Sequence, residues 1–344
     1  PNGRSSRAER LLSRLAAPCL LHAQVEVQDS LALVALYNST NGAQWTSSEN
    51  WLTGPVPTWE GITVMEGRVI QVILPENNLS GPLPPEIGAL TQCARFELST
   101  NGISGGIPAE IGNLTRCTSL DLGRNTLTGS IPSAIGNLIM LQRLNLNGND
   151  LSGSIPSSIG NMDSLRRLIL SVNQLSGPIP NSLFSLVKLE TLHLNQNQLD
   201  GELSSAFGNM AALRSVSIHL NKFTGTIPAA FGNLPQLYSL NLNGNNLEGG
   251  IPPSLGNLTQ LEFLSLHHNS LSGAVPSQIT QCRKLATIVL EHNQLTGLPD
   301  LTSIDSLREL DVHDNRLTFE DIEPNIGIPG VIYSPQAMLG RMHD

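Results

Sequence analysis

The sequence predicts an α/β repeat solenoid, a curved stack of similar coils with a parallel β-sheet along its concave face. Three observations lead to this fold class. An asparagine recurs every 24 residues from Asn77 to Asn293, and Asn315 follows after a further 22. The same residue types surround each asparagine, as expected for a repeat architecture. Composition agrees, because 31 Gly, 22 Pro and 40% hydrophobic residues among 344 fit neither a disordered chain nor collagen.

The strand of each repeat is marked by two apolar positions. If n denotes the recurring asparagine, an aliphatic residue or Phe occupies n−5 and n−3, as Leu144 and Leu146 do before Asn149. This alternation predicts a short strand with one buried face. A unit of this size cannot bury that face alone, so the units stack and their strands form one parallel sheet. We expect the asparagine to turn inward and hydrogen-bond backbone groups of adjacent coils.

Glycine and proline define the turns of the repeat. Gly occupies n+4 in the first ten units, from Gly81 to Gly297, where it permits a backbone conformation that other residues resist. Pro occupies n+7 in eight of the first nine units, and Ser204 is the exception. Because proline fixes φ and lacks an N–H donor, this position predicts a bend after the strand.

One unit carries the motif in full. It reads Asn149-Asp-Leu-Ser-Gly-Ser-Ile-Pro156 and continues with Ile159-Gly-Asn161. It resembles the plant-type leucine-rich repeat, LxxLxLxxNxLSGxIPxxIGN, which occurs in plant receptor-kinase ectodomains, in polygalacturonase-inhibiting proteins and in similar bacterial and algal proteins. The resemblance implies a curved leucine-rich repeat solenoid of about 11 repeats of 24 residues, spanning residues 69–318.

Residues 29–68 are expected to form the N-terminal cap of the solenoid. They begin with a predicted amphipathic helix, with Asp29 or Ser30 as its N-cap. All three Trp of the chain lie in this segment, and we interpret them as the core of the cap, the alternative being an aromatic binding spot. The sequence Trp59-Glu-Gly-Ile62 resembles the cap of plant repeat proteins. The paired cysteines of plant caps are missing, so the cap is more similar to bacterial or algal members.

The two ends of the chain lie outside the repeats. In residues 1–28, four arginines precede a short apolar stretch and then a region of small residues. This order is typical of a secretory signal, so we expect either a signal-peptide remnant or a disordered leader there. Residues 319–344 are expected to be a C-terminal cap followed by an irregular tail.

Two cysteines occupy the same repeat position in adjacent coils. Cys93 and Cys117 both lie at n−8, and stacked strands are about 5 Å apart, within the range for a disulfide. The same position holds a buried leucine in most other units. We therefore favour two free thiols that fill the core, with a disulfide as the alternative.

Charge and hydropathy restrict the class of protein. A net charge of −9 argues against a nucleic-acid partner, and no apolar run is long enough for a transmembrane helix. With the signal-like leader and the family resemblance, this favours a secreted or cell-surface protein. Sequons for N-glycosylation occur at Asn38, Asn78, Asn113 and Asn257. They predict glycans only if a eukaryote secretes the chain.

The outward-facing positions of the predicted sheet, n−6, n−4, n−2 and n−1, form the candidate binding surface. Six of the eight histidines lie on it. Arginine and aromatic side chains often anchor protein ligands, which singles out two arginines and one phenylalanine there. The candidate ligand-binding residues are Arg143, Arg167, His193, His219, Phe263, His267, His268, Glu291, His292 and His313.

The last three coils are predicted to bring several of these side chains into one patch, which Asp311 and Asp314 complete. Three interpretations are open: a transition-metal site, a ligand contact in which His267 and His292 titrate between about pH 5 and 7.5, or a plain polar surface. Side chains on neighbouring strands are expected to point in parallel, which argues against convergence on one ion. We therefore assign no metal and no cofactor.

The function that the resemblance implies is ligand recognition. No nucleophile elbow, phosphate-binding loop or metalloprotease motif is present in the sequence, so we expect a non-enzymatic module that binds a protein, peptide or glycan on the concave face. The alternative is an inhibitor of a secreted polysaccharide hydrolase, as in the polygalacturonase-inhibiting proteins, although the missing cap cysteines count against it. Ice binding would need uniform columns of residues, and the n−2 column is irregular.

Overall fold

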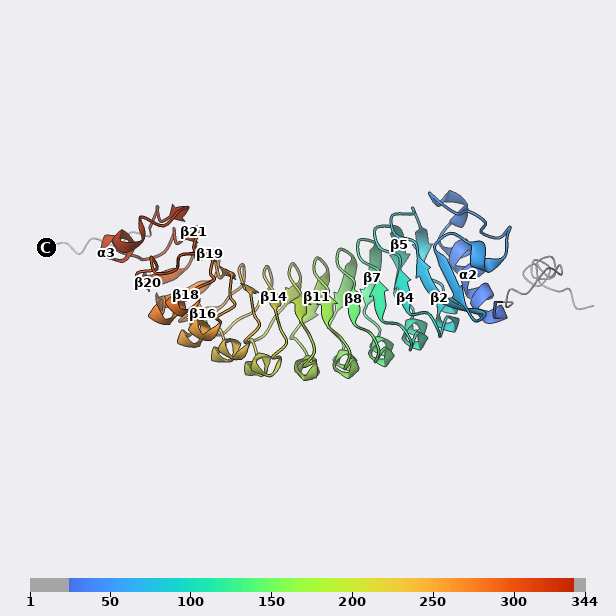
Figure 1. The fold of residues 1–344 in the computed structure, drawn as a ribbon, viewed down its shortest axis with the longest axis horizontal. Coiled ribbons are helices and arrows are strands. Elements are labelled where there is room, and N and C mark those ends of the chain that lie inside the picture. Colours follow the sequence, from blue (N-terminus) through green and yellow to red (C-terminus); the bar gives the residue numbers. More distant parts are fainter. Residues whose placement is uncertain (1–24, 337–344) are drawn as a thin grey trace, which may run out of the picture.

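The computed structural model describes residues 25–336, and these form an elongated arc of stacked coils (Figure 1). Most of the expected leader, residues 1–24, and the end of the expected tail, residues 337–344, lie outside the described part. A 13-stranded sheet runs the whole length of the arc, and its strands follow the order of the sequence. Only β1 and β2 pair antiparallel, and all later strands pair parallel.

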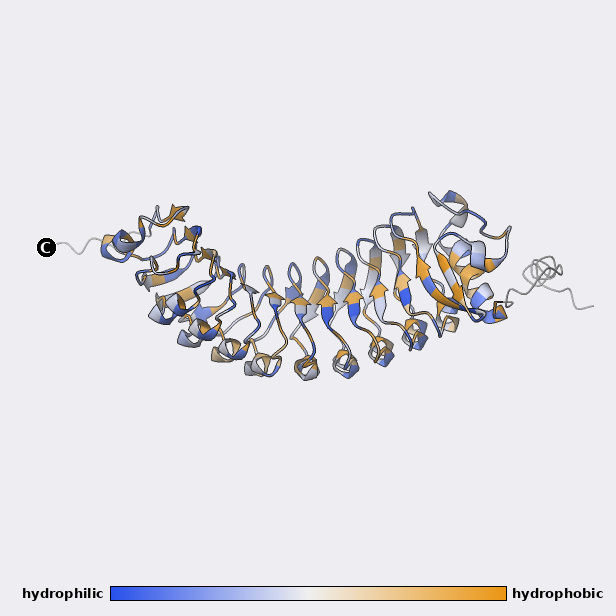
Figure 2. Cartoon of the chain, in the orientation of Figure 1, coloured by the Kyte–Doolittle hydropathy of each residue, from blue (hydrophilic) through white to orange (hydrophobic). Residues whose placement is uncertain are grey.

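The main sheet consists of short strands at the predicted positions. Their bounds are β1 Ile62–Met65, β2 Arg68–Ile73, β4 Arg95–Glu97, β6 Ser119–Asp121, β8 Arg143–Asn145, β10 Arg167–Ile169, β12 Thr191–His193, β14 Ser215–Ser217, β15 Ser239–Asn241, β17 Phe263–Ser265, β19 Thr287–Val289, β21 Glu309–Asp311 and β22 Val331–Ile332. In β8 and β10 the buried leucines pair directly, Leu144 with Leu168, and Arg143 pairs with Arg167. Residues 24 apart therefore stand side by side, and hydrophobic and hydrophilic residues alternate along each coil (Figure 2).

A second set of parallel strands follows each recurring asparagine, and the sequence reasoning did not anticipate it. The bounds are β3 Ser80–Pro82, β5 Gly102–Gly105, β7 Thr126–Ser130, β9 Asp150–Gly153, β11 Gln174–Gly177, β13 Gln198–Leu199, and then β16 Glu248–Gly249, β18 Ser270–Ala274 and β20 Gln294–Gly297. Between β13 and β16 only two isolated bridges remain, Glu202 with Thr224 and Thr226 with Glu248. Each of these coils turns at its n+4 glycine, which has positive φ in nine of the ten units, as at Gly153 (φ 75°).

Among residues 25–336, the nine 3₁₀ turns η3 to η11 belong to the repeats, and they lie along the outer edge of the arc (Figure 1). Their bounds are η3 Pro85–Ala89, η4 Ala109–Asn113, η5 Ser133–Asn137, η6 Ser157–Asn161, η7 Asn181–Ser185, η8 Ser205–Asn209, η9 Ala229–Asn233, η10 Pro253–Asn257 and η11 Ser277–Gln281. The n+7 proline is the N-cap of each turn except η8. There Ser204 takes its place, and its hydroxyl accepts a hydrogen bond from the Ala206 N–H at 3.1 Å.

The 3₁₀ turns stack closely because most carry a glycine at n+11. A Cβ on Gly136 would lie 2.3 Å from the Ser158 carbonyl oxygen of the next coil. In η7 the position is occupied by Phe184, which is buried and packs edge-on against Phe207 at 4.9 Å between ring centroids. Phe207 in turn stacks on Phe231 at 4.8 Å, so three coils here share aromatic contacts, while Gly208 and Gly232 keep the glycine contact in the second and third of them.

The inward turn of the recurring asparagine is confirmed. Asn149 accepts a hydrogen bond from the Leu127 N–H at 3.0 Å and donates to the carbonyl oxygens of Leu122 and Leu146, both at 3.1 Å. The same pattern recurs through successive coils as far as Asn315. These asparagines therefore form a ladder of hydrogen bonds that joins each coil to the one before it.

A glutamine ends this asparagine ladder. The Gln336 side chain accepts hydrogen bonds from the backbone N–H groups of Asn315 and Leu317 at 3.2 and 3.3 Å. It also donates to the Val312 carbonyl oxygen at 3.0 Å. These are the contacts that the asparagine of a further coil would make. The backbone groups of the last coil that such an asparagine would bind therefore all have a partner.

The N-terminal segment packs a helix and three tryptophans over the first coil. It contains α2 (Val27–Ser39), η1 (Gly42–Gln44) and η2 (Val56–Thr58). The tryptophan rings are 2–7% exposed, and their indole N–H groups donate to the carbonyl oxygens of Thr40, Glu60 and Gly54. The rings are therefore core residues of this segment, because buried rings with satisfied N–H groups cannot form an exposed binding spot. The role of residues 29–68 as the cap of the solenoid stays a prediction.

The predicted start of this helix was wrong. The N-cap is Glu26, three or four residues before the predicted Asp29 or Ser30, and its side chain makes no capping bond. Asp29 is instead fully buried inside the helix, where its carboxylate accepts hydrogen bonds from Arg68 Nε and Nη2 at 3.0 Å and from the Val69 N–H at 2.7 Å. Its role is to tie α2 to β2, and that contact could not be read from local helix signals.

The C-terminal segment closes on the last coil through α3 (Phe319–Ile322), η12 (Glu323–Asn325) and β22. Thr318 and Asp321 form a reciprocal capping box at the start of α3. Residues beyond Ile328 were expected to be irregular, but β22 pairs in parallel with β21 and extends the main sheet by one strand.

The cysteines of the described residues are buried and not disulfide-bonded. The Cys93 and Cys117 thiols donate to the carbonyl oxygens of Arg95 and Ser119, both at 3.1 Å. Burial raises the pKa of Cys117 to about 12, and raises that of Cys93 as well. The favoured interpretation of two free core thiols is confirmed.

Candidate ligand-binding face

The outward positions of the main sheet form straight columns because the strands pair in register. Most strands of the sheet end at n−4, so n−6 and n−4 lie on the strand, whereas n−2 and n−1 lie in the turn beyond it. The candidate residues fall into three regions along the columns: two arginines on β8 and β10, two histidines on the middle coils, and a histidine–carboxylate cluster on the last three coils. This cluster comprises His267, His268, Glu291, His292, Asp311, His313 and Asp314.

In the arginine region, one of the two arginines is paired with a carboxylate of the neighbouring strand and the other is not. Arg143 Nη2 lies 3.1 Å from Asp121 Oδ2, and the Asn145 amide donates to the other oxygen of Asp121 at 2.9 Å. Arg167 is exposed and makes no ion pair with any residue between 25 and 336. It is thus the arginine of this region that can meet an acidic ligand group without first breaking an existing pair.

The middle coils present two histidines without carboxylate partners. His193 Nε2 lies 3.0 Å from the Ser215 hydroxyl, and His219 Nδ1 lies 2.9 Å from the Ser217 hydroxyl. Burial lowers the pKa of both imidazoles. These two side chains are neutral near pH 7 and present hydrogen-bonding groups to the surface.

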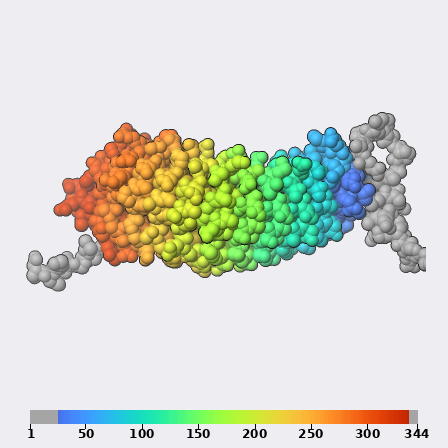
Figure 3. Space-filling view, turned by 90° about the horizontal axis from the view of Figure 1, so that it is seen from below, coloured from blue at the N-terminus to red at the C-terminus, as the bar shows by residue number. Residues whose placement is uncertain are grey.

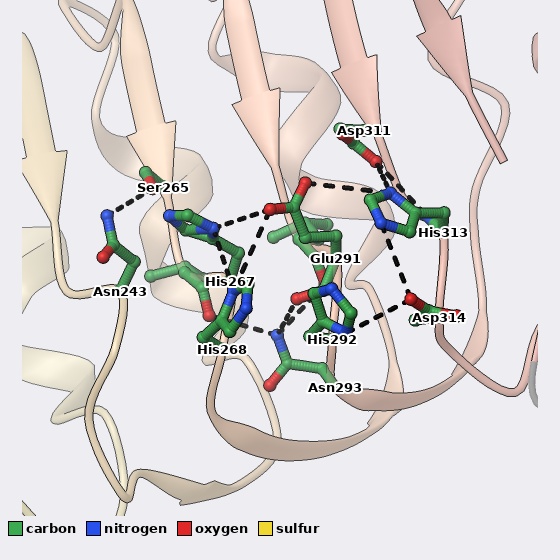
Figure 4. Close-up of polar contacts among 12 residues, drawn as sticks. Asn243, Ser265, His267, His268, Glu291, His292, Asn293, Asp311, His313 and Asp314 are labelled. Carbon is green, nitrogen blue, oxygen red and sulfur yellow. Dashed lines mark hydrogen bonds and ion pairs between the residues drawn. The ribbon is translucent and has the colours of Figure 1, made fainter.

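The histidine–carboxylate cluster is held together by short contacts across three coils (Figure 4). His267 Nδ1 lies 2.9 Å from Glu291 Oε1, and His313 Nδ1 lies 2.5 Å from Asp311 Oδ1. His292 Nδ1 lies 3.2 Å from Asp314 Oδ2. The rings of His268 and His292 are also close, with centroids 4.2 Å apart. The predicted patch is therefore present as one connected group of side chains.

The expectation that these side chains point in parallel was wrong. Three groups of three potential ligand atoms each lie within 4.8 Å of one another in the cluster. The cause is the backbone at n−1, where His268, His292 and Asp314 have φ near 50°. The strand has ended there, and a left-handed residue directs its side chain away from the regular alternation.

This turn had a signal in the sequence that the initial reasoning missed. Gly148 and Gly244 occupy the same n−1 position in other coils, and both have positive φ. Asn, Asp and His are also the non-glycine residues that best tolerate the left-handed conformation. The two glycines at n−1 therefore indicate a turn rather than a strand position, although Val172 and Leu220 adopt the same conformation in their own coils.

Titration within the cluster differs from group to group. Burial lowers the pKa of His267 to about 4, and the charge of His268 adds to the effect. Burial also raises the pKa of Glu291 to about 7. In contrast, the hydrogen bond to Asp311 raises the pKa of His313. His267 is thus neutral above about pH 5, which argues against the open interpretation in which it titrates between about pH 5 and 7.5.

The remaining predicted residues lie apart from one another. Phe263 is half-buried on β17, in the same coil as His267, whereas the two arginines lie several coils away. The four sequon asparagines Asn38, Asn78, Asn113 and Asn257 are all exposed, and their glycosylation stays a prediction. Within residues 25–336, no helix is both long and apolar enough to cross a bilayer.

Comparison with known proteins identifies the repeat. Family profiles described as leucine-rich repeat match residues 116–138, 140–162, 164–186, 188–210, 212–234 and 236–258, and another of the same description matches residues 259–317. A comparison with curated proteins gave no match.

Several solved structures share the fold. The ectodomain of the receptor kinase GASSHO1/SCHENGEN3 from Arabidopsis thaliana, in complex with Casparian strip integrity factor 2, is 33% identical, with a TM-score of 0.85 over 89% of this chain and 38% of that chain. The ectodomain of the Arabidopsis receptor kinase HAESA, in complex with an extended IDA peptide hormone, is 29% identical, with a TM-score of 0.67 over 84% of this chain and 53% of that chain.

A bacterial structure is similar over more of its own length. The leucine-rich repeat protein LIC12759 of Leptospira interrogans is 29% identical, with a TM-score of 0.57 over 76% of this chain and 71% of that chain. By contrast, the chain spans about two fifths and about half of the two plant ectodomains. The repeat profiles, the parallel sheet and these similarities together show that the chain belongs to the leucine-rich repeat proteins.

Proposed function

We propose that the chain is a non-enzymatic binding module that recognises an extended peptide segment on its concave face, as a secreted or cell-surface recognition protein. The observation that carries the proposal is the set of in-register columns, which present a long row of exposed side chains on a rigid sheet. Structures of similar plant ectodomains contain a peptide hormone or an integrity factor, which supports a ligand of this kind.

The chemistry of the face changes along its length. Arg167 offers a cation on the earlier coils, and the histidine–carboxylate cluster offers imidazoles and carboxylates at the far end. Phe263 is the one candidate with a large apolar surface. A peptide lying along the columns would therefore meet different groups at its two ends, which favours one binding direction over the reverse.

The proposal is tested by selecting dodecapeptides from a phage-displayed library on the full chain and measuring their affinity by fluorescence anisotropy. We expect Arg167→Glu and Phe263→Ala each to weaken binding by at least about tenfold, the size of a typical hot-spot effect. The matched control is Arg116→Glu, because Arg116 is an exposed arginine that lies before the strand of its coil rather than on the concave columns. Peptides that bind both concave variants as tightly as the unchanged chain would refute the proposal.

The inhibitor alternative has a separate test. A hydrolase inhibitor would lower the activity of secreted polygalacturonases at micromolar protein concentration. No inhibition across a panel of such enzymes would exclude it and leave peptide binding untouched. On an array that carries both peptides and glycans, binding to glycans alone would show that the ligand is a glycan and not a peptide.

A further inference from the structure

We propose that His292, His313 and Asp314 form a binding site for a divalent transition-metal ion on the concave face. The site goes beyond peptide recognition and does not depend on it. It belongs to the last two coils and to the turns that follow β19 and β21.

The first argument is the placement of the donor atoms. His292 Nδ1 lies 3.2 Å from Asp314 Oδ2, and His313 Nε2 lies 3.6 Å from the same oxygen. Ligand atoms around a tetrahedral zinc ion are about 3.4 Å apart, given metal–ligand distances of about 2.0–2.2 Å. Two of the three donor pairs therefore stand close to the spacing that one ion requires, and all three donor atoms lie within 4.8 Å of one another.

The second argument is the orientation of His313. Its Nδ1 lies 2.5 Å from Asp311 Oδ1, and the Asp311 side chain is only 11% exposed. A buried carboxylate that accepts the Nδ1–H proton leaves the Nε2 lone pair free, and Nε2 is the atom that faces Asp314 (Figure 4). Metal-binding histidines commonly have such a carboxylate behind them, which fixes the tautomer and the ring plane.

The third argument is access and donor type. The side chains of His292 and Asp314 are 43% and 34% exposed, so an ion can enter from solvent. Two imidazoles and one carboxylate suit Zn²⁺, Ni²⁺ or Cu²⁺, whereas Ca²⁺ and Mg²⁺ prefer sets of oxygen ligands. Three protein ligands leave a fourth position for water or for the adjacent His268, whose ring centroid is 4.2 Å from that of His292.

Two other histidines of the concave face, on the middle coils, lack this arrangement. His193 and His219 pair with serine hydroxyls, which are not metal ligands of comparable strength. They provide a matched control, because both are half-buried imidazoles at outward positions of the same sheet.

The test is isothermal titration of the untagged full chain with ZnCl₂ at pH 7.5, after dialysis against a chelator and then against buffer. We expect one zinc ion per chain at this site, with binding weakened at least about tenfold by His292→Ala and by His313→Ala. Asp311→Asn removes no ligand but should also weaken binding, by about tenfold. Without the carboxylate, the proton of His313 is no longer held on Nδ1 and the ring is no longer fixed in position. The double variant His193→Ala/His219→Ala should bind like the unchanged chain.

Cobalt spectra separate this site from cysteine ligation. Co²⁺ bound by nitrogen and oxygen ligands gives visible d–d bands without the near-ultraviolet charge-transfer band of thiolate ligands. Absence of zinc binding, binding that survives both His292→Ala and His313→Ala, or binding that is lost only in His267→Ala/His268→Ala would each overturn the assignment. Circular dichroism of every variant excludes loss of fold as the cause of a lost signal.

Discussion

At the residue scale, the ladder asparagines are the side chains on which the repeat depends most. Each one is a single small amide that satisfies backbone groups in its own coil and in the preceding coil. Asn149, for example, has four hydrogen-bond partners on the backbone and is 8% exposed. An apolar residue of similar size would fit the space but would leave those groups without partners.

The substitution Asn149→Ala should therefore lower the free energy of unfolding by about 1–3 kcal/mol for each backbone group left buried and unpaired. Chemical denaturation followed by circular dichroism measures the change. Asn161→Ala is the control, because Asn161 belongs to the same repeat but is exposed at the end of η6. Equal losses for the two variants would show that the ladder contributes nothing specific.

The buried histidines of the middle coils predict a pH effect on stability. Burial lowers the pKa of His193 and His219 in the folded chain, whereas the unfolded chain takes up protons near pH 6.5. Between these values the unfolded state binds more protons, so stability is full above about pH 6.5 and falls as the pH drops toward the folded pKa. The variant His193→Gln/His219→Gln should lose less stability than the unchanged chain between about pH 6.5 and 5.

Denaturation midpoints at a series of pH values measure this effect. The measurements need a chelator, which removes any contribution from metal binding at the far end of the sheet. A variant whose midpoint falls with pH as steeply as that of the unchanged chain would contradict the expected role of these two imidazoles.

At the element scale, the attachment of the first helix to the sheet rests on one buried carboxylate. Asp29 bridges α2 to Arg68 and to the Val69 N–H of β2. Because the Arg68 side chain is 30% exposed, it can regain water when the carboxylate is removed, but the Val69 N–H is buried and cannot. The cost of removing the carboxylate is thus set by the backbone group rather than by the ion pair.

Asp29→Ala is expected to destabilise the cap by about 1–3 kcal/mol. Hydrogen–deuterium exchange should show faster exchange of the α2 amides in the variant, with no change in the middle coils. Gln28→Ala, an exposed neighbour in the same helix, is the control. Protection of α2 that is the same in all three proteins would mean that other contacts hold the helix.

The elements that the sequence predicted well are those set by local pattern. The strands follow the buried alternation at n−5 and n−3, and the bends follow the proline at n+7. The second sheet was not predicted, because its residues, such as Thr126–Ser130 in β7, are mostly exposed and carry no alternation. The repeat spacing predicts which side chains of the histidine–carboxylate cluster lie in neighbouring coils. Their convergence depends on left-handed turns such as that at His292, and the spacing alone does not predict such turns.

At the scale of the whole molecule, each coil touches mainly its neighbours in sequence. The colours in Figure 3, which follow the sequence, change in order along the surface, so on this face each segment lies beside its neighbours in sequence. Stability in such an array is close to a sum of coil energies and nearest-neighbour terms, so a local defect stays local. The end coils depend on whatever replaces the missing neighbour, and at the C-terminal end the Gln336 amide has that role.

Gln336→Ala should therefore loosen only the last coils. The backbone N–H groups of Asn315 and Leu317 would lose their partner, and we expect faster hydrogen exchange in β21 and β22 but not in β8 or β10. Glu320→Ala, at an exposed position of α3, is the control. Faster exchange spread evenly over all coils would show that the array unfolds as one unit.

The break in the second sheet has a mechanical consequence. Between β13 and β16 the coils keep the main sheet and the asparagine ladder, but the second sheet is reduced to two single bridges. One coil before this break, Phe184 stands where most other coils have glycine, so the close backbone contact of the outer edge is replaced at that point by a contact between aromatic rings. Under a pulling force along its axis, the solenoid should be stiffer on either side of this break than within it. The coil of Asn221 should therefore extend first.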